Sequence, residues 1–143
     1  MIAVDTNLLV HAHRQDASLH CEAKVCVRQL AEAAAPWFVC FHSLVEFYGV
    51  VTHAKIWGAP SSPDQAADQI AAWRECPSLR ILTELPDHID DLMAVAHAGK
   101  VAGPMIHDAR IASCCLTHGV RELWTIDRDF SRFPRLQTRN PLI

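Results

Sequence analysis

An aspartate directly behind a short apolar run constrains the fold of this chain more than any other feature of its sequence. Residues 2–4 are apolar and fit a short buried strand, and Asp5 follows them at once. Two small polar residues, Thr6 and Asn7, come next. This order places Asp5 at the carboxyl end of a core strand, where ligands bind in open α/β sheets. We therefore interpret Asp5 as one corner of an acidic, metal-binding cluster whose other corners lie later in the chain.

Further apolar runs alternate with helical patterns along the chain. Residues 37–41, 79–82 and 122–126 are rich in strand-forming types, and 136–143 fits a short last strand or a tail. Helices are predicted at 8–13, 16–35, 42–54, 62–76, 86–99 and 103–119. This alternation predicts an α/β fold with three layers, α/β/α, around a central, mainly parallel sheet of four to five strands. No repeat or long linker divides the chain, so we expect one domain over residues 1–143.

Composition excludes several classes of protein. Of the 143 residues, 50% are hydrophobic and 20% are charged, as in ordinary soluble globular proteins. The apolar runs are far shorter than the ~20 residues that span a bilayer, and the N-terminus has no signal-peptide pattern. We therefore expect a cytoplasmic protein without a membrane partner. Six cysteines form no C-x-x-C pair and no zinc-type spacing, which indicates free thiols in a reducing compartment.

Charge is distributed unevenly along the chain, although the net charge is only −3. From Arg110 to the end there are six arginines against three acids, so the last third is basic while the rest is acidic. A solvated basic tail and a surface that faces phosphates both explain this distribution.

Four of the sixteen acidic residues stand beside predicted strand ends or in the helix turns that follow them. They are Asp5, Glu46, Asp108 and Asp127. Parallel crossovers bring these positions to one edge of the sheet, although they are far apart in the sequence. Carboxylates gathered there repel one another, and a divalent cation removes the repulsion. Mg²⁺ and Mn²⁺ prefer oxygen ligands, so the pattern predicts a centre that holds one of these ions and activates water against phosphate esters.

Each acid also has a purely structural interpretation. Ser43 and Glu46 have the spacing of a capping box, in which the glutamate bonds back to the serine amide. Asp108 can stabilise a helix N-terminus through the helix dipole. Asp5 and Asp127 can serve as turn residues. Only the occurrence of all four acids beside strand ends favours a metal centre over these alternatives.

Motifs for other chemistries are absent or incomplete. No H-E-x-x-H, G-x-S-x-G, Walker A or G-x-G-x-x-G pattern occurs, and the spacing of the nine histidines does not favour a zinc site. His107 adjoins Asp108 but points about 100° away from it on a helix, which leaves a phosphate contact or a supporting role open. A strand followed by aspartate also begins phosphatases with an aspartate nucleophile, but their D-x-D pattern has an aspartate where Asn7 stands here.

Four short motifs carry the acidic residues: IAVDTNLL at 2–9, SLVEF at 43–47, IHDARIA at 106–112 and TIDRDF at 125–130. In order, spacing and total length they resemble the PIN-domain family and, within it, the VapC-type toxins of bacterial toxin–antitoxin systems. The resemblance covers essentially the whole chain, although each motif is short. It implies a single PIN-like nuclease domain over residues 1–143.

The resemblance implies a metal-dependent endoribonuclease, the toxin of a toxin–antitoxin pair, which hydrolyses RNA phosphodiesters with metal-activated water. Mg²⁺ or Mn²⁺ is the implied cofactor. The implied catalytic and metal-binding residues are Asp5, Glu46, Asp108 and Asp127. The implied supporting groups are Thr6, Asn7 and Thr125, with Asp129 near the site but outside the quartet, as a loop or cap residue. The arginines considered for RNA contacts are Arg110, Arg128 and Arg132.

The same resemblance implies three partners. They are an RNA substrate of the transfer or ribosomal class, a cognate antitoxin whose tail enters the acidic site, and a second copy in a homodimer. Two other functions stay open from the residues alone: a catalytically silent PIN-like binding module, and a phosphatase with an aspartate nucleophile. Four intact, mutually repelling acids argue against the silent module.

Overall fold

Five strands and six α-helices make up the fold, which a computed structural model describes for residues 1–143. The strands are β1 (Ile2–Val4), β2 (Trp37–Cys40), β3 (Leu79–Leu82), β4 (Glu122–Trp124) and β5 (Gln137–Arg139). The helices are α1 (Thr6–His13), α2 (His20–Glu32), α3 (Phe41–Val51), α4 (Pro63–Arg74), α5 (His88–Ala98) and α6 (Ile106–Thr117). Two short 3₁₀ helices are η1 (Gly103–Met105) and η2 (Arg128–Arg132). None of the helices is long and apolar enough to cross a membrane.

All five strands are parallel and lie in the order β3-β2-β1-β4-β5. The predicted parallel sheet is therefore confirmed, and the segment at 136–143 contains a strand rather than forming only a tail. The chain builds outward from β1 to β3 and then returns to β4 on the other side of β1. The direction of winding thus reverses between β1 and β4. In such sheets a ligand crevice forms outside the carboxyl ends of these two strands.

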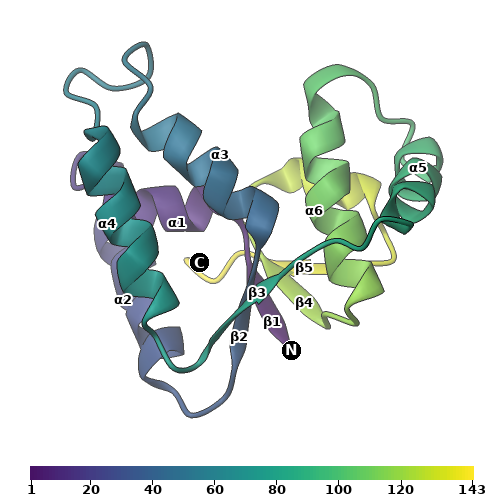
Figure 1. Cartoon of the computed structure of the whole chain (residues 1–143), viewed down its shortest axis with the longest axis horizontal. Helices are drawn as coiled ribbons and strands as arrows, with labels where there is room; N and C mark the ends of the chain where they lie inside the picture. Colours follow the sequence, from purple (N-terminus) through teal and green to yellow (C-terminus); the bar gives the residue numbers. More distant parts are fainter.

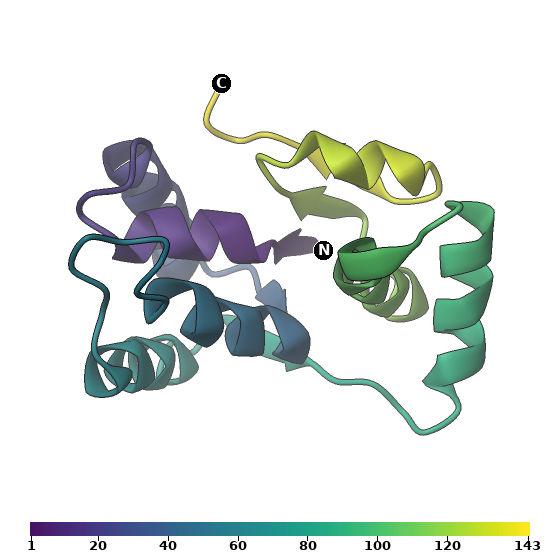
Figure 2. The same ribbon diagram turned by 90° about the horizontal axis from the view of Figure 1, so that it is seen from above.

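Helices cover both faces of the sheet, which gives the three predicted layers (Figure 1 and Figure 2). Helices α1 to α4 lie over one face, and α5, α6 and η2 lie over the other. The core of the first side contains Leu8, Trp37 and Phe47, all almost fully buried. The core of the second side contains Ile111 and Phe130. Helix α6 is largely buried, as its apolar surface predicts.

Helix α3 begins earlier than its sequence suggests. Strand β2 runs directly into the helix, with Cys40 at the N-cap and no side-chain cap bond. Ser43 therefore lies inside α3, where its hydroxyl is buried and has no hydrogen-bond partner. The predicted capping box between Ser43 and Glu46 is wrong, because neither residue stands at the helix start.

The other helix boundaries differ by a few residues from the predicted ones. The helix expected at 16–35 spans only His20–Glu32, and the helix expected at 86–99 begins at His88. The helix expected from 103 is preceded by η1, which Gly103 enters with a φ of 62° that favours glycine. Asp108 is consequently the third residue of α6, in its first turn.

Candidate metal centre

Asp5 lies at the junction of β1 and α1, where the main-chain ladder of the sheet ends. Its N–H donates to the Trp124 carbonyl at 3.0 Å, and its Oδ1 caps α1 by accepting the Thr6 N–H at 2.7 Å. Its Oδ2 accepts the Thr125 hydroxyl at 2.6 Å. Only 4% of Asp5 is exposed. Asp5 is itself the helix cap, and these bonds fix its carboxylate in one orientation.

Thr125 joins the end of β4 to the other polar residues. Its hydroxyl, which donates to Asp5, also accepts the Asp127 N–H at 3.0 Å and the Asn7 Nδ2–H at 3.2 Å. The Asn7 Oδ1 in turn accepts the Ile126 N–H at 3.4 Å. Asn7 and Thr125 therefore bind the start of α1 to the loop after β4, which holds the crevice between β1 and β4 in shape.

Glu46 reaches the same crevice from α3. Its Oε1 accepts the Thr6 hydroxyl at 3.0 Å, and its side chain is 28% exposed. Thr6 thus contacts two acids, since its N–H bonds to Asp5 and its hydroxyl to Glu46. The bond to Thr6, rather than a helix cap, orients Glu46.

Three further carboxylates gather at the opposite side of the crevice. Oxygens of Asp108, Asp127 and Asp129 all lie within 4.8 Å of one another. Asp127 caps η2, because its Oδ1 accepts the Asp129 N–H at 2.8 Å. Asp129 was expected near the site but outside the acidic quartet, as a loop or cap residue. The tight turn that Asp127 caps brings the Asp129 carboxylate next to that of Asp108.

One open pocket of about 280 Å³ contains the four predicted acids. Thr6 and Asn7 line it as well. Trp57 and Val50 supply part of an apolar wall that no motif in the sequence singled out. The acids of four separate elements therefore converge on one space, as the parallel topology predicts.

Crowding and burial change the electrostatics of two of these acids. Burial raises the pKa of Asp5 to about 7, with smaller contributions from Asp108 and Glu46, against the lowering effect of its bonds to Thr125 and Thr6. Burial also raises the pKa of Asp108 to about 6, and the charges of Asp127, Glu46 and Asp129 add to this. A cluster of carboxylates that resist ionisation together fits a hard divalent cation, which favours oxygen ligands and the ionised form.

The arginines considered for RNA contacts stand in different surroundings. The Arg110 Nε donates to the Glu84 Oε1 at 2.6 Å, and its Nη1 lies 3.2 Å from the His42 Nδ1. Arg128 and Arg132 are exposed on η2, directly after Asp127 in the chain. Neither of them has a carboxylate partner, although Arg132 donates to the Gly99 carbonyl at 3.4 Å.

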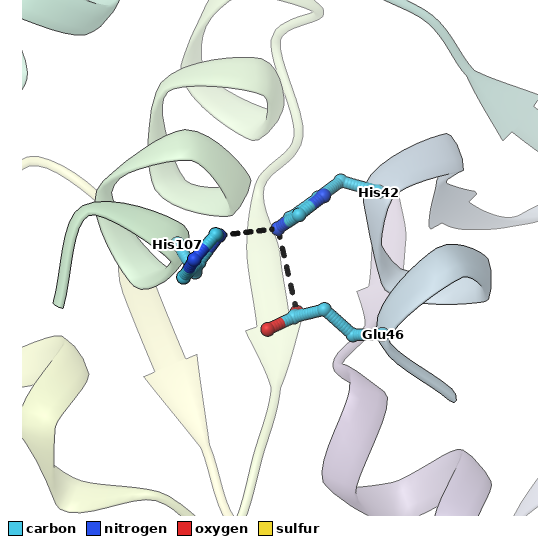
Figure 3. A group of neighbouring side chains, drawn as sticks. All are labelled: His42, Glu46 and His107. Atoms are coloured by element: carbon cyan, nitrogen blue, oxygen red, sulfur yellow. Dashed lines mark hydrogen bonds and ion pairs between the residues drawn. The ribbon is translucent and has the colours of Figure 1, made fainter. Parts of the chain in front are cut away.

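A second group of metal-binding side chains adjoins the acids, and sequence reasoning did not find it. The side chains of His42, Glu46 and His107 place one nitrogen or oxygen atom each within 4.8 Å of the others (Figure 3). The two histidines are separated by 65 positions, so no spacing pattern in the sequence connects them. The i, i+4 relation of His42 and Glu46 on α3 was the only local signal.

Comparison with known proteins identifies the class to which this fold and pocket belong. The PIN domain model matches residues 2–136, which include every residue that lines the acidic pocket. The chain therefore belongs to the PIN-domain family. Within that family it is a VapC-type ribonuclease: it is 32% identical to Ribonuclease VapC43 of Mycobacterium tuberculosis over 142 residues, covering 99% of this chain and 96% of the relative.

Two solved structures share the fold. VapC20 of Mycobacterium tuberculosis, a sarcin-ricin loop cleaving toxin, has a TM-score of 0.70 and 19% identity, over 92% of this chain and 93% of VapC20. VapBC2 of Rickettsia felis, bound to a DNA fragment from its promoter, has a TM-score of 0.70 and 18% identity, over 97% of this chain and 98% of the other. At these identities the likeness concerns the fold alone.

Proposed function

We propose that this protein is an endoribonuclease that uses Mg²⁺ or Mn²⁺ held by Asp5, Glu46, Asp108 and Asp127. The observation that carries the proposal is the meeting of acids from separate elements in one pocket, where the pKa of Asp5 rises to about 7 and that of Asp108 to about 6. Without a cation this arrangement destabilises the folded chain, because the same acids ionise more easily when the chain is unfolded. A function that needs a cation explains why the chain carries them.

The residues of the chain prepare the site before any substrate arrives. The Thr6 and Thr125 bonds hold Asp5 with its oxygens fixed, and the Thr6 hydroxyl orients Glu46. Asp108 lies in the first turn of α6, where the positive end of the helix dipole favours its ionised form. When bound, the cation lowers the pKa of coordinated water and offsets the charge of the phosphate under attack. Asp129 adds negative charge beside Asp108 and is a further candidate ligand.

The RNA backbone is the proposed substrate, and the basic last third of the chain is the proposed surface for it. Arg128, exposed and directly after Asp127 in the chain, is the proposed phosphate contact, whereas Arg132 donates to the Gly99 carbonyl at 3.4 Å and must leave that bond to contribute. Arg110 already bonds to Glu84, so its contribution requires that this pair opens. Binding through arginines and phosphates weakens as salt is raised.

The proposed partners follow from the same charges. A cognate antitoxin with a basic side chain in its tail neutralises the acidic pocket in place of the cation and so blocks it. The fold shared with the Rickettsia felis VapBC2 assembly supports an antitoxin partner, and the basic tail is inferred from the acids of the pocket alone. We also propose a homodimer, an RNA substrate of the transfer or ribosomal class and action in the cytoplasm, where such RNA is found.

Cleavage of RNA with and without metal tests the proposal. The purified protein is incubated with folded transfer and ribosomal RNA in Mg²⁺, Mn²⁺ or EDTA, and the new ends are mapped. We expect cleavage that EDTA abolishes, and loss of cleavage in Asp5→Asn and Asp108→Asn with the fold retained. The matched control is Asp90→Asn, an exposed acid on α5 outside the pocket. Wild-type rates in either pocket variant would refute the assignment.

Two alternatives give different results in the same experiment. A silent binding module retains RNA or protein binding but cuts nothing in any metal. A phosphatase with an aspartate nucleophile forms an aspartyl phosphate that acid quenching traps on Asp5. The absence of this adduct during active cleavage excludes the phosphatase mechanism.

A further inference from the structure

The side chains of His42, Glu46 and His107, here called the histidine cluster, point toward one another from two helices (Figure 3). The His42 Nε2 lies 3.1 Å from the His107 Nδ1 and 3.8 Å from the Glu46 Oε1. The two imidazole rings are nearly parallel, with an interplanar angle of 17°. Two of the three side chains reach solvent, since His107 is exposed and Glu46 is partly exposed.

The sequence builds this cluster from two helix starts. His42 and Glu46 are one turn apart on α3, so their side chains share a face of that helix. His107 is the second residue of α6, which packs beside α3 at the carboxyl edge of the sheet. His42 is 7% exposed, whereas His107 opens to solvent, so the cluster has one fixed wall and one accessible side.

We propose that the histidine cluster is a second metal site, which adjoins the acidic centre and shares Glu46 with it, and that it takes Zn²⁺ or a similar late divalent transition metal. The ligands are the His42 Nε2, the His107 Nδ1 and a Glu46 carboxylate oxygen. In a tetrahedral zinc site with bonds of about 2.0–2.1 Å, ligand atoms lie about 3.3 Å apart. The spacings of 3.1 and 3.8 Å lie close to that value, and the exposed side leaves room for water as the fourth ligand.

Ligand chemistry separates this site from the acidic centre. Two imidazoles and one carboxylate favour zinc-class metals, whereas sites made only of oxygen favour Mg²⁺ or Mn²⁺. A ring tilt at the exposed His107 and a rotation of Glu46 are the movements needed to aim all three lone pairs at one ion. Both side chains have the solvent access for this.

Arg110 opposes metal binding in the arrangement seen here. Its Nη1 donates to the His42 Nδ1 at 3.2 Å, which puts the ring proton of His42 on Nε2, where it can bond to His107. A metal on Nε2 requires the proton on Nδ1, facing the guanidinium. Binding therefore breaks the contact between Arg110 and His42, while the ion pair of Arg110 with Glu84 can remain.

Sharing of Glu46 links the two sites. Glu46 bonds to Thr6 at the acidic centre and lies within reach of His42 in the histidine cluster. An ion held by the histidines draws Glu46 away from the acidic centre, so zinc inhibits the Mg²⁺-dependent reaction. This consequence rests on the proposed nuclease function, whereas the metal site itself does not.

Titration with Co²⁺, a coloured stand-in for Zn²⁺, tests the site directly. Four-coordinate Co²⁺ absorbs visible light far more strongly than six-coordinate Co²⁺ in an all-oxygen site. We expect one equivalent of strongly absorbing Co²⁺ that Zn²⁺ displaces and excess Mg²⁺ does not. A weak spectrum that Mg²⁺ abolishes overturns the proposal.

Matched variants locate the bound ion. His107→Ala should weaken Co²⁺ binding more than about tenfold. Loss of a residue that only supports a metal ligand already weakens binding by about that factor, so loss of a ligand should exceed it. The control His97→Ala, an exposed histidine on α5, binds as the wild type does, and so does Asp108→Asn at the acidic centre. Glu46→Gln, which changes the proposed carboxylate ligand on α3, should weaken Co²⁺ binding as well. Equal binding by the wild type and His107→Ala overturns the proposal.

Two further arms separate this proposal from the nuclease function. Arg110→Met removes the opposing donor and tightens Co²⁺ binding by about 3- to 10-fold; weaker binding in this variant contradicts the role given to Arg110.

In the activity arm, Zn²⁺ slows RNA cleavage by the wild type but not by His107→Ala, each compared with its own zinc-free rate. If the wild type itself does not cleave RNA, the nuclease proposal fails while the Co²⁺ spectra still decide the metal site.

Discussion

Two walls of the acidic pocket hold their carboxylates in opposite ways. At the edge of the sheet, Asp5 is buried and accepts hydrogen bonds of 2.7 and 2.6 Å from Thr6 and Thr125. At the helical wall, Asp108 is only half buried, its carboxylate accepts no hydrogen bond, and it faces Asp127 and Asp129. Hydrogen bonds fix the first wall, whereas the second wall brings like charges together, since Asp127, Glu46 and Asp129 all raise the pKa of Asp108.

The contrast shows which part of the site depends on a ligand. Removing a donor from the sheet wall takes away a bond that the folded chain uses. Removing an acid from the helical wall relieves repulsion between carboxylates and so stabilises the folded chain, unless a bound cation offsets that repulsion. Variants of the two walls should therefore change stability in opposite directions while both reduce activity.

Asp108→Asn is expected to have the largest effect. Cleavage should fall more than about 100-fold, beyond the 10- to 100-fold that loss of a supporting group causes. In EDTA the variant should be more stable than the wild type, because one repelling charge is gone. Mn²⁺ at 100 times its Kd should add about 2.7 kcal/mol to the unfolding free energy of the wild type and little to that of the variant. Thermal unfolding with and without Mn²⁺ measures both quantities; lower stability of the variant in EDTA would contradict the contrast between the walls.

Thr125→Val tests the sheet wall. It removes the hydroxyl that donates to Asp5 and accepts from Asn7 and Asp127, so cleavage should fall by about 10- to 100-fold. Stability in EDTA should fall as well, by about 1–3 kcal/mol, since buried polar groups lose their partner. Thr125→Ser keeps the hydroxyl and is the control. Equal rates for the valine and serine variants would show that the hydroxyl is dispensable.

Removal of metal should make stability depend on pH. The folded pKa values of Asp5 and Asp108, about 7 and about 6, lie above the ordinary 3.8, so the folded chain holds protons that the unfolded chain has released. The unfolding free energy in EDTA should therefore be highest near pH 4 and decrease as pH rises toward 7. Denaturant titrations across this range measure the slope, which should be smaller in Asp108→Asn. A slope that saturating Mn²⁺ leaves unchanged would argue against these acids as ligands.

The sequence alone predicted the parts of this site that depend on regular structure. Apolar runs and helical periodicity defined the parallel sheet, and the sheet in turn brought Asp5, Glu46, Asp108 and Asp127 to one edge. The error at Ser43 arose because β2 passes into α3 without a side-chain cap, so the apparent capping box lay inside the helix. Local patterns could not reveal this, since the true helix start carries no capping signal.

Contacts between distant segments were beyond the reach of such patterns. His42 and His107 meet only because α3 and α6 start at the same edge of the sheet. Arg110 appeared free for RNA, but its bond to Glu84 comes from the loop after β3. Asp129 joins the acids through the tight turn at η2. Each depends on side-chain placement after folding, which residue spacing does not encode.

The smallest effect is expected from Arg128→Ala at the rim beside the helical wall. Arg128 is exposed and makes no salt bridge, so its removal should leave stability unchanged and weaken RNA binding by about 3- to 10-fold. The slope of log affinity against log salt should decrease by about 1, as for one lost phosphate contact. Arg28→Ala on α2 removes the same charge away from the pocket and is the control. Because both variants change the net charge equally, an identical loss in the two would mean that general attraction, rather than a contact at the pocket, brings RNA to this protein.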